Sequence, residues 1–253
     1  MHIGLCTIAD GESPVGEVMR EAAAAGYDGV EIWGRGHVDG TNGTPDEARR
    51  TAIDLNLDIP TYGSYLRPGT PEFAESYEAE LEIATALDAN LVRVWAGNQE
   101  YGVHDPGHWK RTVSDLRELA TAASERDIGV TVEKHEGTLT DDGAGARRLI
   151  ERVDEPNCGL NWQPLFGMTS DAIRAEVEDL APLSNNVHIQ AVPESGATTR
   201  CALTDAFFDV EHVVRTLQAA DFDGYVNVEF VRDDIDFVRA IEADLDYLRS
   251  LAR

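Results

Sequence analysis

The segment VTVEKHEGTL, Val130 to Leu139, begins as a buried strand and ends in titratable residues. Its first residues are β-branched and favour a pleated conformation, whereas Glu133, Lys134 and His135 follow them without a break. Side chains alternate along a strand, so Glu133 and His135 share one face while Lys134 points to the other. A strand that simply runs out into solvent would look similar, and the rest of the chain decides between the two interpretations.

Seven further apolar runs resemble this strand, and segments with helical spacing separate them. The eight expected strands lie at residues 2–7, 29–33, 57–62, 90–96, 128–133, 157–163, 185–190 and 224–230. Ser-Pro or Thr-Pro pairs at 13–14, 44–45 and 70–71 open three of the helices. The other helices are expected at about 109–126, 142–153, 170–181, 204–220 and 234–252.

Strict alternation of strands and helices implies a parallel sheet, because each crossover needs a helix. Eight such units in 253 residues match a closed (β/α)8 TIM barrel with outer helices. An open doubly wound sheet is the competitor, but no GxGxxG follows the first strand. No linker or shift in composition divides the chain, so we expect one domain over residues 1–253.

The chain is strongly acidic, with 47 Asp and Glu against 21 Lys and Arg, a net charge of −26. Such a surface repels phosphates and argues against binding nucleic acid. Dispersed acidic residues with almost no lysine resemble proteins of salt-loving cytoplasms, and a halophilic archaeon is the expected source. No apolar run approaches the length of a membrane span, so a cytoplasmic protein is expected.

In a (β/α)8 barrel the active site lies at the carboxyl ends of the strands. Glu133 ends the fifth expected strand, Asn161 and Gln163 the sixth, His188 lies in the seventh, and Glu229 ends the eighth. Two carboxylates, an imidazole and an amide oxygen at one mouth would bind a divalent cation such as Mn²⁺, Mg²⁺ or Co²⁺. The sequence therefore predicts a metal site there.

Five stretches carry a resemblance to a known family: GYDGVEIWG (26–34), VEKHEGTL, NCGLNWQP (157–164), NNVHIQ and YVNVEF. In order and spacing they resemble the xylose isomerase-like TIM barrels of the sugar phosphate isomerase/epimerase family. The resemblance implies that Glu133, Gln163, His188 and Glu229 bind one metal ion. It also implies that Glu133 and Glu229 are acid/base partners on opposite faces of a carbon next to a carbonyl.

The sequence departs from this family pattern after the sixth strand. Gln163 stands where the family has an Asp, and Phe166 stands where epimerases often have a His. A neutral amide removes one negative charge from the ligand set, so the cation should be held less tightly.

Aromatic residues and His135 are candidates for contacts with the substrate. Trp33, Trp95 and Trp162 lie near strand ends, where an aromatic face can pack against a sugar. Trp162 should point away from Gln163, towards a helix. His135 is expected either to bind a substrate hydroxyl or to anchor its loop.

Several arginines follow the strands or lie within them. Arg93 lies inside an apolar strand, and Glu31 on a neighbouring strand is its expected partner. Arg232 follows the eighth strand and is a candidate for binding a substrate phosphate or carboxylate. The other arginines in equivalent loops are Arg35, Arg67 and Arg200.

The expected function is a metal-dependent isomerase or epimerase of a small sugar, sugar phosphate or polyol derivative, acting by proton transfer next to a carbonyl. One alternative is a lyase that dehydrates an inosose- or dehydroshikimate-like substrate. Another is a non-catalytic sugar-binding barrel whose metal site has lapsed. The expected partner is a small carbohydrate rather than nucleic acid or a membrane, and a homo-oligomer is left open.

Overall fold

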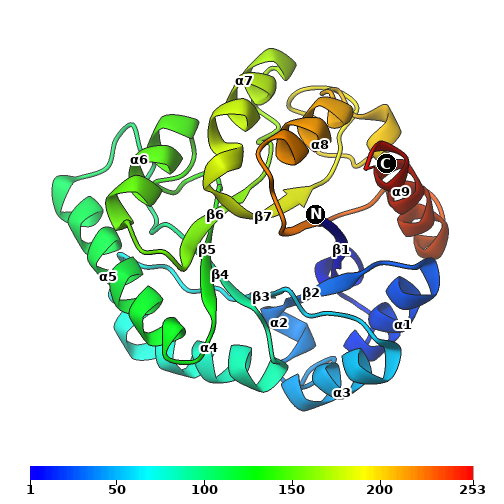
Figure 1. The fold of residues 1–253 in the computed structure, drawn as a ribbon, viewed down its shortest axis with the longest axis horizontal. Helices are drawn as coiled ribbons and strands as arrows, with labels where there is room; N and C mark the ends of the chain where they lie inside the picture. Colours follow the sequence, from blue (N-terminus) through cyan, green and yellow to red (C-terminus); the bar gives the residue numbers. More distant parts are fainter. Residues whose placement is uncertain (253) are drawn as a thin grey trace.

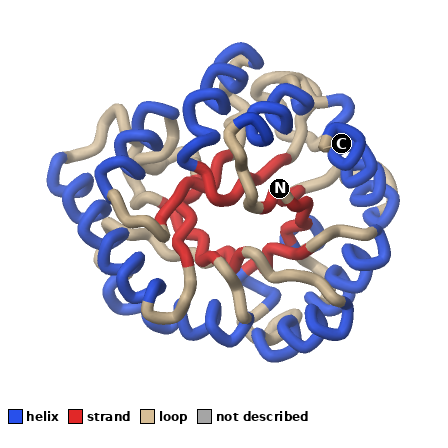
Figure 2. Tube along the Cα trace, in the orientation of Figure 1, coloured by secondary structure: helices blue, strands red, loops and turns tan. Residues whose placement is uncertain are grey.

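The computed structural model describes residues 1–252, and within them eight parallel strands close into a barrel. Each strand pairs with the next in sequence and the last pairs with the first, so Figure 2 shows a ring of strands inside a ring of helices. The strands are β1 His2–Cys6, β2 Gly29–Trp33, β3 Thr61–Gly63, β4 Leu91–Trp95, β5 Gly129–Glu133, β6 Cys158–Trp162, β7 Ser184–Ile189 and β8 Tyr225–Val228. The predicted TIM barrel is confirmed.

Helices surround the barrel and follow the strands in turn (Figure 1). The α-helices are α1 Val15–Ala25, α2 Gly34–His37, α3 Pro45–Leu55, α4 Phe73–Leu87, α5 Pro106–Ser124, α6 Gly143–Val153, α7 Ser170–Leu180, α8 Val210–Ala219 and α9 Phe237–Leu251. Short 3-10 turns are η1 Thr7–Asp10, η2 Ala181–Leu183 and η3 Leu203–Asp205. No helix in residues 1–252 is long and apolar enough to cross a membrane.

Two faces of each strand have different compositions, and this division positions the site. In β5, Val130 and Val132 are fully buried and belong to the hydrophobic core that the helices cover. Thr131 and Glu133 alternate with them and therefore face the barrel interior. Trp162 follows the same rule, because its Nε1 donates to Glu176 of α7, as predicted from its position beside Gln163.

Two elements begin later than predicted, the third strand and helix α8. The third strand was expected at 57–62 but begins only at Thr61, because Pro60 has no N–H to donate to the ladder. Helix α8 begins at Val210 rather than 204, since Asp209 caps it and accepts from His212 N.

Candidate metal centre and active site

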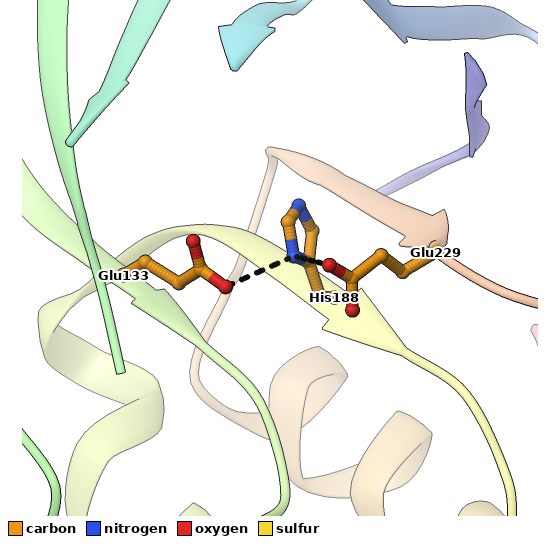
Figure 3. A group of neighbouring side chains, drawn as sticks. All are labelled: Glu133, His188 and Glu229. Carbon is orange, nitrogen blue, oxygen red and sulfur yellow. Dashed lines mark ion pairs between the residues drawn. The ribbon is translucent and has the colours of Figure 1, made fainter. Parts of the chain in front are cut away.

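Three side chains from different strands converge at the mouth of the barrel. Glu133 ends β5, His188 lies in β7, and Glu229 follows β8, and one potential ligand atom from each lies within 4.8 Å of the others. Nδ1 of His188 is 3.9 Å from Glu133 Oε1 and 3.5 Å from Glu229 Oε1 (Figure 3). All three residues are buried.

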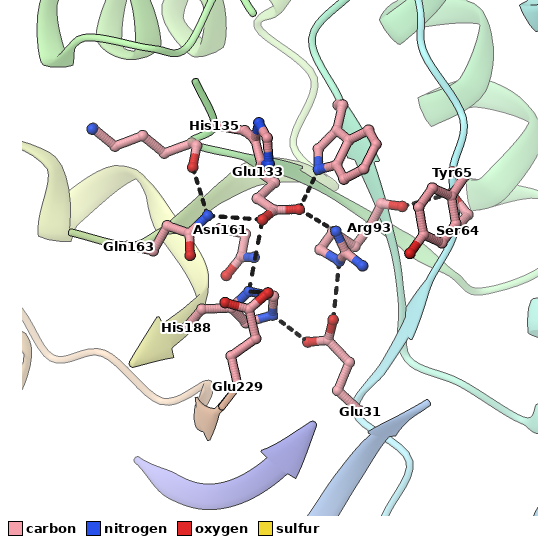
Figure 4. Close-up of polar contacts among 12 residues, drawn as sticks. Glu31, Ser64, Tyr65, Arg93, Glu133, His135, Asn161, Gln163, His188 and Glu229 are labelled. Carbon is pink, nitrogen blue, oxygen red and sulfur yellow. Dashed lines mark hydrogen bonds and ion pairs between the residues drawn. The ribbon is translucent and has the colours of Figure 1, made fainter. Parts of the chain in front are cut away.

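Gln163 adds an amide to this group. Its Nε2 donates to Glu133 Oε1 at 2.8 Å and to the Lys134 carbonyl at 2.9 Å (Figure 4). Among residues 1–252, neither Gln163 Oε1 nor His188 Nδ1 has a hydrogen-bond partner, although both atoms are buried. Buried polar atoms are rarely left without a partner, so these two are free to serve as ligands.

The four predicted ligands thus lie together, and their chemistry fits a divalent cation. Two carboxylate oxygens, an imidazole nitrogen and an amide oxygen are acceptable donors for Mn²⁺, Mg²⁺ or Co²⁺. Gln163 Oε1 and His188 Nδ1 are buried without hydrogen-bond partners, and a bound cation would satisfy both atoms. The donor set does not select one of these metals.

Glu31 of β2 lies fully buried beneath the group. Its Oε1 accepts from Arg93 Nε at 3.0 Å, and its Oε2 accepts from His188 Nε2 at 2.8 Å (Figure 4). The same Oε2 also accepts from Asn186 Nδ2 at 3.1 Å. Burial alone would raise the pKa of Glu31, but His188 and Arg93 outweigh it and lower that pKa to about 2. Glu31 is therefore ionised at neutral pH.

This anion fixes the orientation of the His188 ring. Because ionised Glu31 can only accept, Nε2 of His188 carries a proton and Nδ1 faces Glu133 and Glu229. Burial alone would lower the pKa of His188, but Glu31 and Glu229 raise it to about 9. A cation bound at Nδ1 would take the place of the second proton.

Arg93 of β4 links Glu31 to Glu133, which lies across the site. The predicted pair of Arg93 with Glu31 is confirmed, but β3 lies between β2 and β4, so the pair bridges over one strand. Gly63 of β3 leaves the necessary room: a Cβ there would lie 2.6 Å from Arg93 Nη2 and 3.3 Å from Glu31 Oε1. Nη1 of Arg93 also forms an ion pair with Glu133.

The two glutamates of the metal group have different environments. Glu133 Oε2 accepts from Arg93 and from Trp95 Nε1, while Oε1 accepts from Gln163. Burial acts to raise the pKa of Glu133, but Arg93 and His188 lower it overall. Burial and the neighbouring Glu133 raise the pKa of Glu229, against the effect of His188. Such opposed shifts are typical of carboxyl groups with separate roles.

Aromatic side chains form one wall of the mouth. Trp95 lies 4.9 Å from His135 and 5.1 Å from Tyr65 between ring centres. Trp33 Nε1 donates to the Tyr65 hydroxyl at 2.6 Å. The predicted substrate residues Trp33, Trp95 and His135 thus share this wall.

Arg232, the fourth predicted substrate residue, is paired with an acidic side chain. Its Nε and Nη2 donate to the two carboxylate oxygens of Asp234 at 2.6 and 2.7 Å. That pairing gives no support to a substrate role for Arg232.

A cavity of about 180 Å³ opens beside the metal group. Its lining includes His135, Gln163, Phe166, Gln190 and Arg200.

Gln190 received no role from the sequence, although it lies two residues beyond His188. Its Nε2 donates to Glu229 Oε2, and its buried Oε1 has no partner among residues 1–252. The period-two spacing from His188 is the signal that could have identified it.

A profile of the xylose isomerase-like TIM barrels matches residues 19–251. The chain belongs to this family. Family membership agrees with the predicted resemblance and with the barrel.

Two curated proteins similar to this chain are 3-dehydroshikimate dehydratases. The protein from Pseudomonas aeruginosa is 25% identical in an alignment of 253 positions, and the match covers 93% of this chain and 39% of that protein. The protein from Bacillus anthracis is 24% identical in an alignment of 205 positions, and the match covers 76% of this chain and 72% of that protein. The chain thus spans about two fifths of the length of the Pseudomonas relative.

Solved structures with this fold include a probable dehydratase and an epimerase. A probable 3-dehydroshikimate dehydratase from Bacillus anthracis superposes with a TM-score of 0.81 at 19% identity, covering 98% of this chain and 99% of that chain. The 3-keto-D-glucoside 4-epimerase from E. coli superposes with a TM-score of 0.79 at 22% identity, covering 99% of each chain. At these identities the likeness shows the fold alone.

Proposed function

We propose that this protein is a metal-dependent lyase that removes water from a cyclic hydroxylated ketone of the 3-dehydroshikimate type. The curated relatives that carry this activity support the proposal. So does the asymmetry of the two glutamates, which favours one proton-transferring group over the two that an epimerase needs.

The asymmetry is visible in the hydrogen bonds. Glu133 accepts from Arg93, Trp95 and Gln163, so its lone pairs are largely committed. Within residues 1–252, Gln190 is the one hydrogen-bond donor to Glu229. Glu229 therefore retains an oxygen that can take a proton, whereas Glu133 acts as a fixed anionic ligand. This difference carries the proposal.

The reaction follows from these positions. A divalent cation, when bound, stabilises the negative charge that develops on the substrate carbonyl oxygen. Glu229 takes the proton from the carbon next to the carbonyl, and the resulting carboxylic acid is the proton donor for the leaving hydroxyl. It returns the proton to that hydroxyl, the C–O bond breaks, a C=C bond forms and water leaves. The aromatic wall of Trp95 and Tyr65 limits the access of solvent to the enolate.

The test is turnover of 3-dehydroshikimate by protein loaded with Mn²⁺, Mg²⁺ or Co²⁺. Loss of water and enolisation of that substrate give a dihydroxybenzoate, which ultraviolet absorbance detects. We expect an aromatic product that requires the metal and disappears with EDTA. Absence of product with every metal would refute the lyase proposal.

The second candidate is an epimerase, and the facing positions of Glu133 and Glu229 on either side of His188 Nδ1 favour it (Figure 3). Ketoses incubated in D₂O distinguish the two reactions. An epimerase introduces deuterium at a carbon next to the carbonyl and forms no alkene. Sugar binding without metal binding and without either reaction would instead favour the non-catalytic barrel whose metal site has lapsed.

A further inference from the structure

The strongest unassigned feature of the mouth is Arg200, in the loop between β7 and η3. Its guanidinium carbon lies 5.1 Å from the ring centre of Phe166 and equally far from that of Phe230. The side chain is half-buried and lines the cavity next to Gln163 and Gln190. Arg200 therefore lies at the entrance to the metal group, held against two aromatic faces.

Arg200 has no anionic partner within the described residues 1–252, although the chain carries 47 acidic residues. Burial lowers the pKa of this guanidinium, and the charge of Glu229 raises it without a hydrogen bond between the two. A half-buried guanidinium is expected to have a carboxylate or phosphate partner. The guanidinium of Arg200, which lacks such a partner, lines the cavity.

The backbone around Arg200 is held in place. Cys201 N donates to the Ala191 carbonyl at 3.0 Å, which keeps Arg200 beside the end of β7. Leu203 N donates to Asp244 Oδ1 at 2.8 Å, and Gly196 N donates to the Phe166 carbonyl at 2.7 Å. The guanidinium is thus presented by an anchored loop, as a binding site requires.

The charge of the metal group is compatible with an anionic ligand. Glu31, Glu133 and Glu229 contribute three negative charges, and Arg93 with a divalent cation would balance them. Neutral Gln163 keeps this balance, whereas an Asp in its place would leave the group negative. Arg200 then adds an uncompensated positive charge at the entrance.

We infer that Arg200 binds a carboxylate of the substrate, so that the substrate class is a hydroxylated keto acid and not a neutral sugar. The inference rests on the proposed function for the identity of the reacting ketone. The planar guanidinium would hold the carboxylate through two parallel N–H donors, while the ketone end of the molecule reaches Glu229.

Calorimetry with two matched ligands tests this assignment without turnover. The probes are 3,4-dihydroxybenzoate and catechol, which differ only in the carboxylate, added to Mn²⁺-loaded protein. We expect Arg200→Gln to weaken 3,4-dihydroxybenzoate binding by about 10- to 100-fold, the loss for one charge-assisted pair, and to leave catechol binding unchanged. Arg232→Gln is the control, since Asp234 already pairs with that arginine, and it should alter neither.

Retained catechol binding also shows that the variant is folded. Equal binding of 3,4-dihydroxybenzoate by Arg200→Gln and the parent protein would overturn the assignment. So would tighter Arg200-dependent binding of a phosphate monoester than of the carboxylate. Arg200-dependent carboxylate binding without dehydratase turnover would refute the lyase and leave this inference intact. Dehydratase turnover that Arg200→Gln does not impair would support the lyase and overturn the assignment of Arg200.

Discussion

Glu31 and His188 are joined across the barrel interior by a hydrogen bond of 2.8 Å between Oε2 and Nε2. The two residues lie on β2 and β7, which are not paired in the sheet. The bond leaves His188 Nδ1 facing Glu133 and Glu229, so a carboxylate outside the group of candidate ligands orients the imidazole within it.

Replacing Glu31 should therefore weaken metal binding. Glu31→Gln removes the anion that holds Arg93 and His188, and we expect Mn²⁺ affinity to fall by about 10- to 100-fold. The free energy of unfolding should fall by roughly 3 kcal/mol, because Arg93 loses one of two buried anions. Calorimetry and chemical denaturation measure the two effects. Glu78→Gln, which breaks an exposed pair with Arg126, is the control and should change little.

The two glutamates of the metal group should respond differently to neutralisation. At saturating Mn²⁺, Glu229→Gln should lower kcat by about 10²- to 10⁴-fold, the usual contribution of a general base. Glu133→Gln should act first on metal affinity and stability, because Arg93 then loses a buried partner. Metal titrations and turnover on the same samples separate the effects. Full turnover by Glu229→Gln would remove it from the mechanism.

Gln163 sets the charge of the ligand group, and Gln163→Glu changes that charge without changing the length of the side chain. We expect Mn²⁺ to bind about tenfold more tightly, because a third carboxylate joins the group. Without metal the variant should melt at a lower temperature, since a carboxylate replaces the amide that donates to Glu133. Gln218→Glu places the same charge on α8 as a control. Unchanged metal affinity would indicate that the site has lapsed.

Asp244 of α9 should make stability depend on pH. Burial raises its pKa to about 6, against the opposing effects of the Leu203 N–H and Arg232. The folded protein thus favours the protonated acid, and its contribution is complete below about pH 4 and lost as pH rises through 6. The loss amounts to about 3 kcal/mol for a shift of roughly two units.

Asp244→Asn removes this titration while keeping an oxygen for the Leu203 N–H. The variant should gain melting temperature relative to the parent at pH 8 and lose the advantage at pH 4. Thermal melts across this range measure the difference. A constant difference at all pH values would show that folding does not raise the pKa of Asp244.

Glu133, His188 and Glu229 could be predicted because the carboxyl ends of parallel strands meet at one mouth. The contact of Glu31 with His188 could not, since contacts across a barrel depend on strand tilt and not on spacing in the sequence. The sequence predicts the pair of Arg93 with Glu31, but not the open space at Gly63 that lets this pair cross β3, nor the second ion pair of Arg93 with Glu133. The late start of β3 follows from Pro60, whose missing donor the pattern of apolar residues conceals.

The alternation along β5 has a consequence for how such an enzyme changes over generations. Val130 and Val132 pack against the helices, whereas Thr131 and Glu133 face the interior. The residues that stabilise the fold and those available for chemistry therefore lie at separate positions. Mutation can explore one set while the other preserves the scaffold. Descendants of a single ancestral barrel can therefore acquire new catalytic repertoires without having to invent a new architecture.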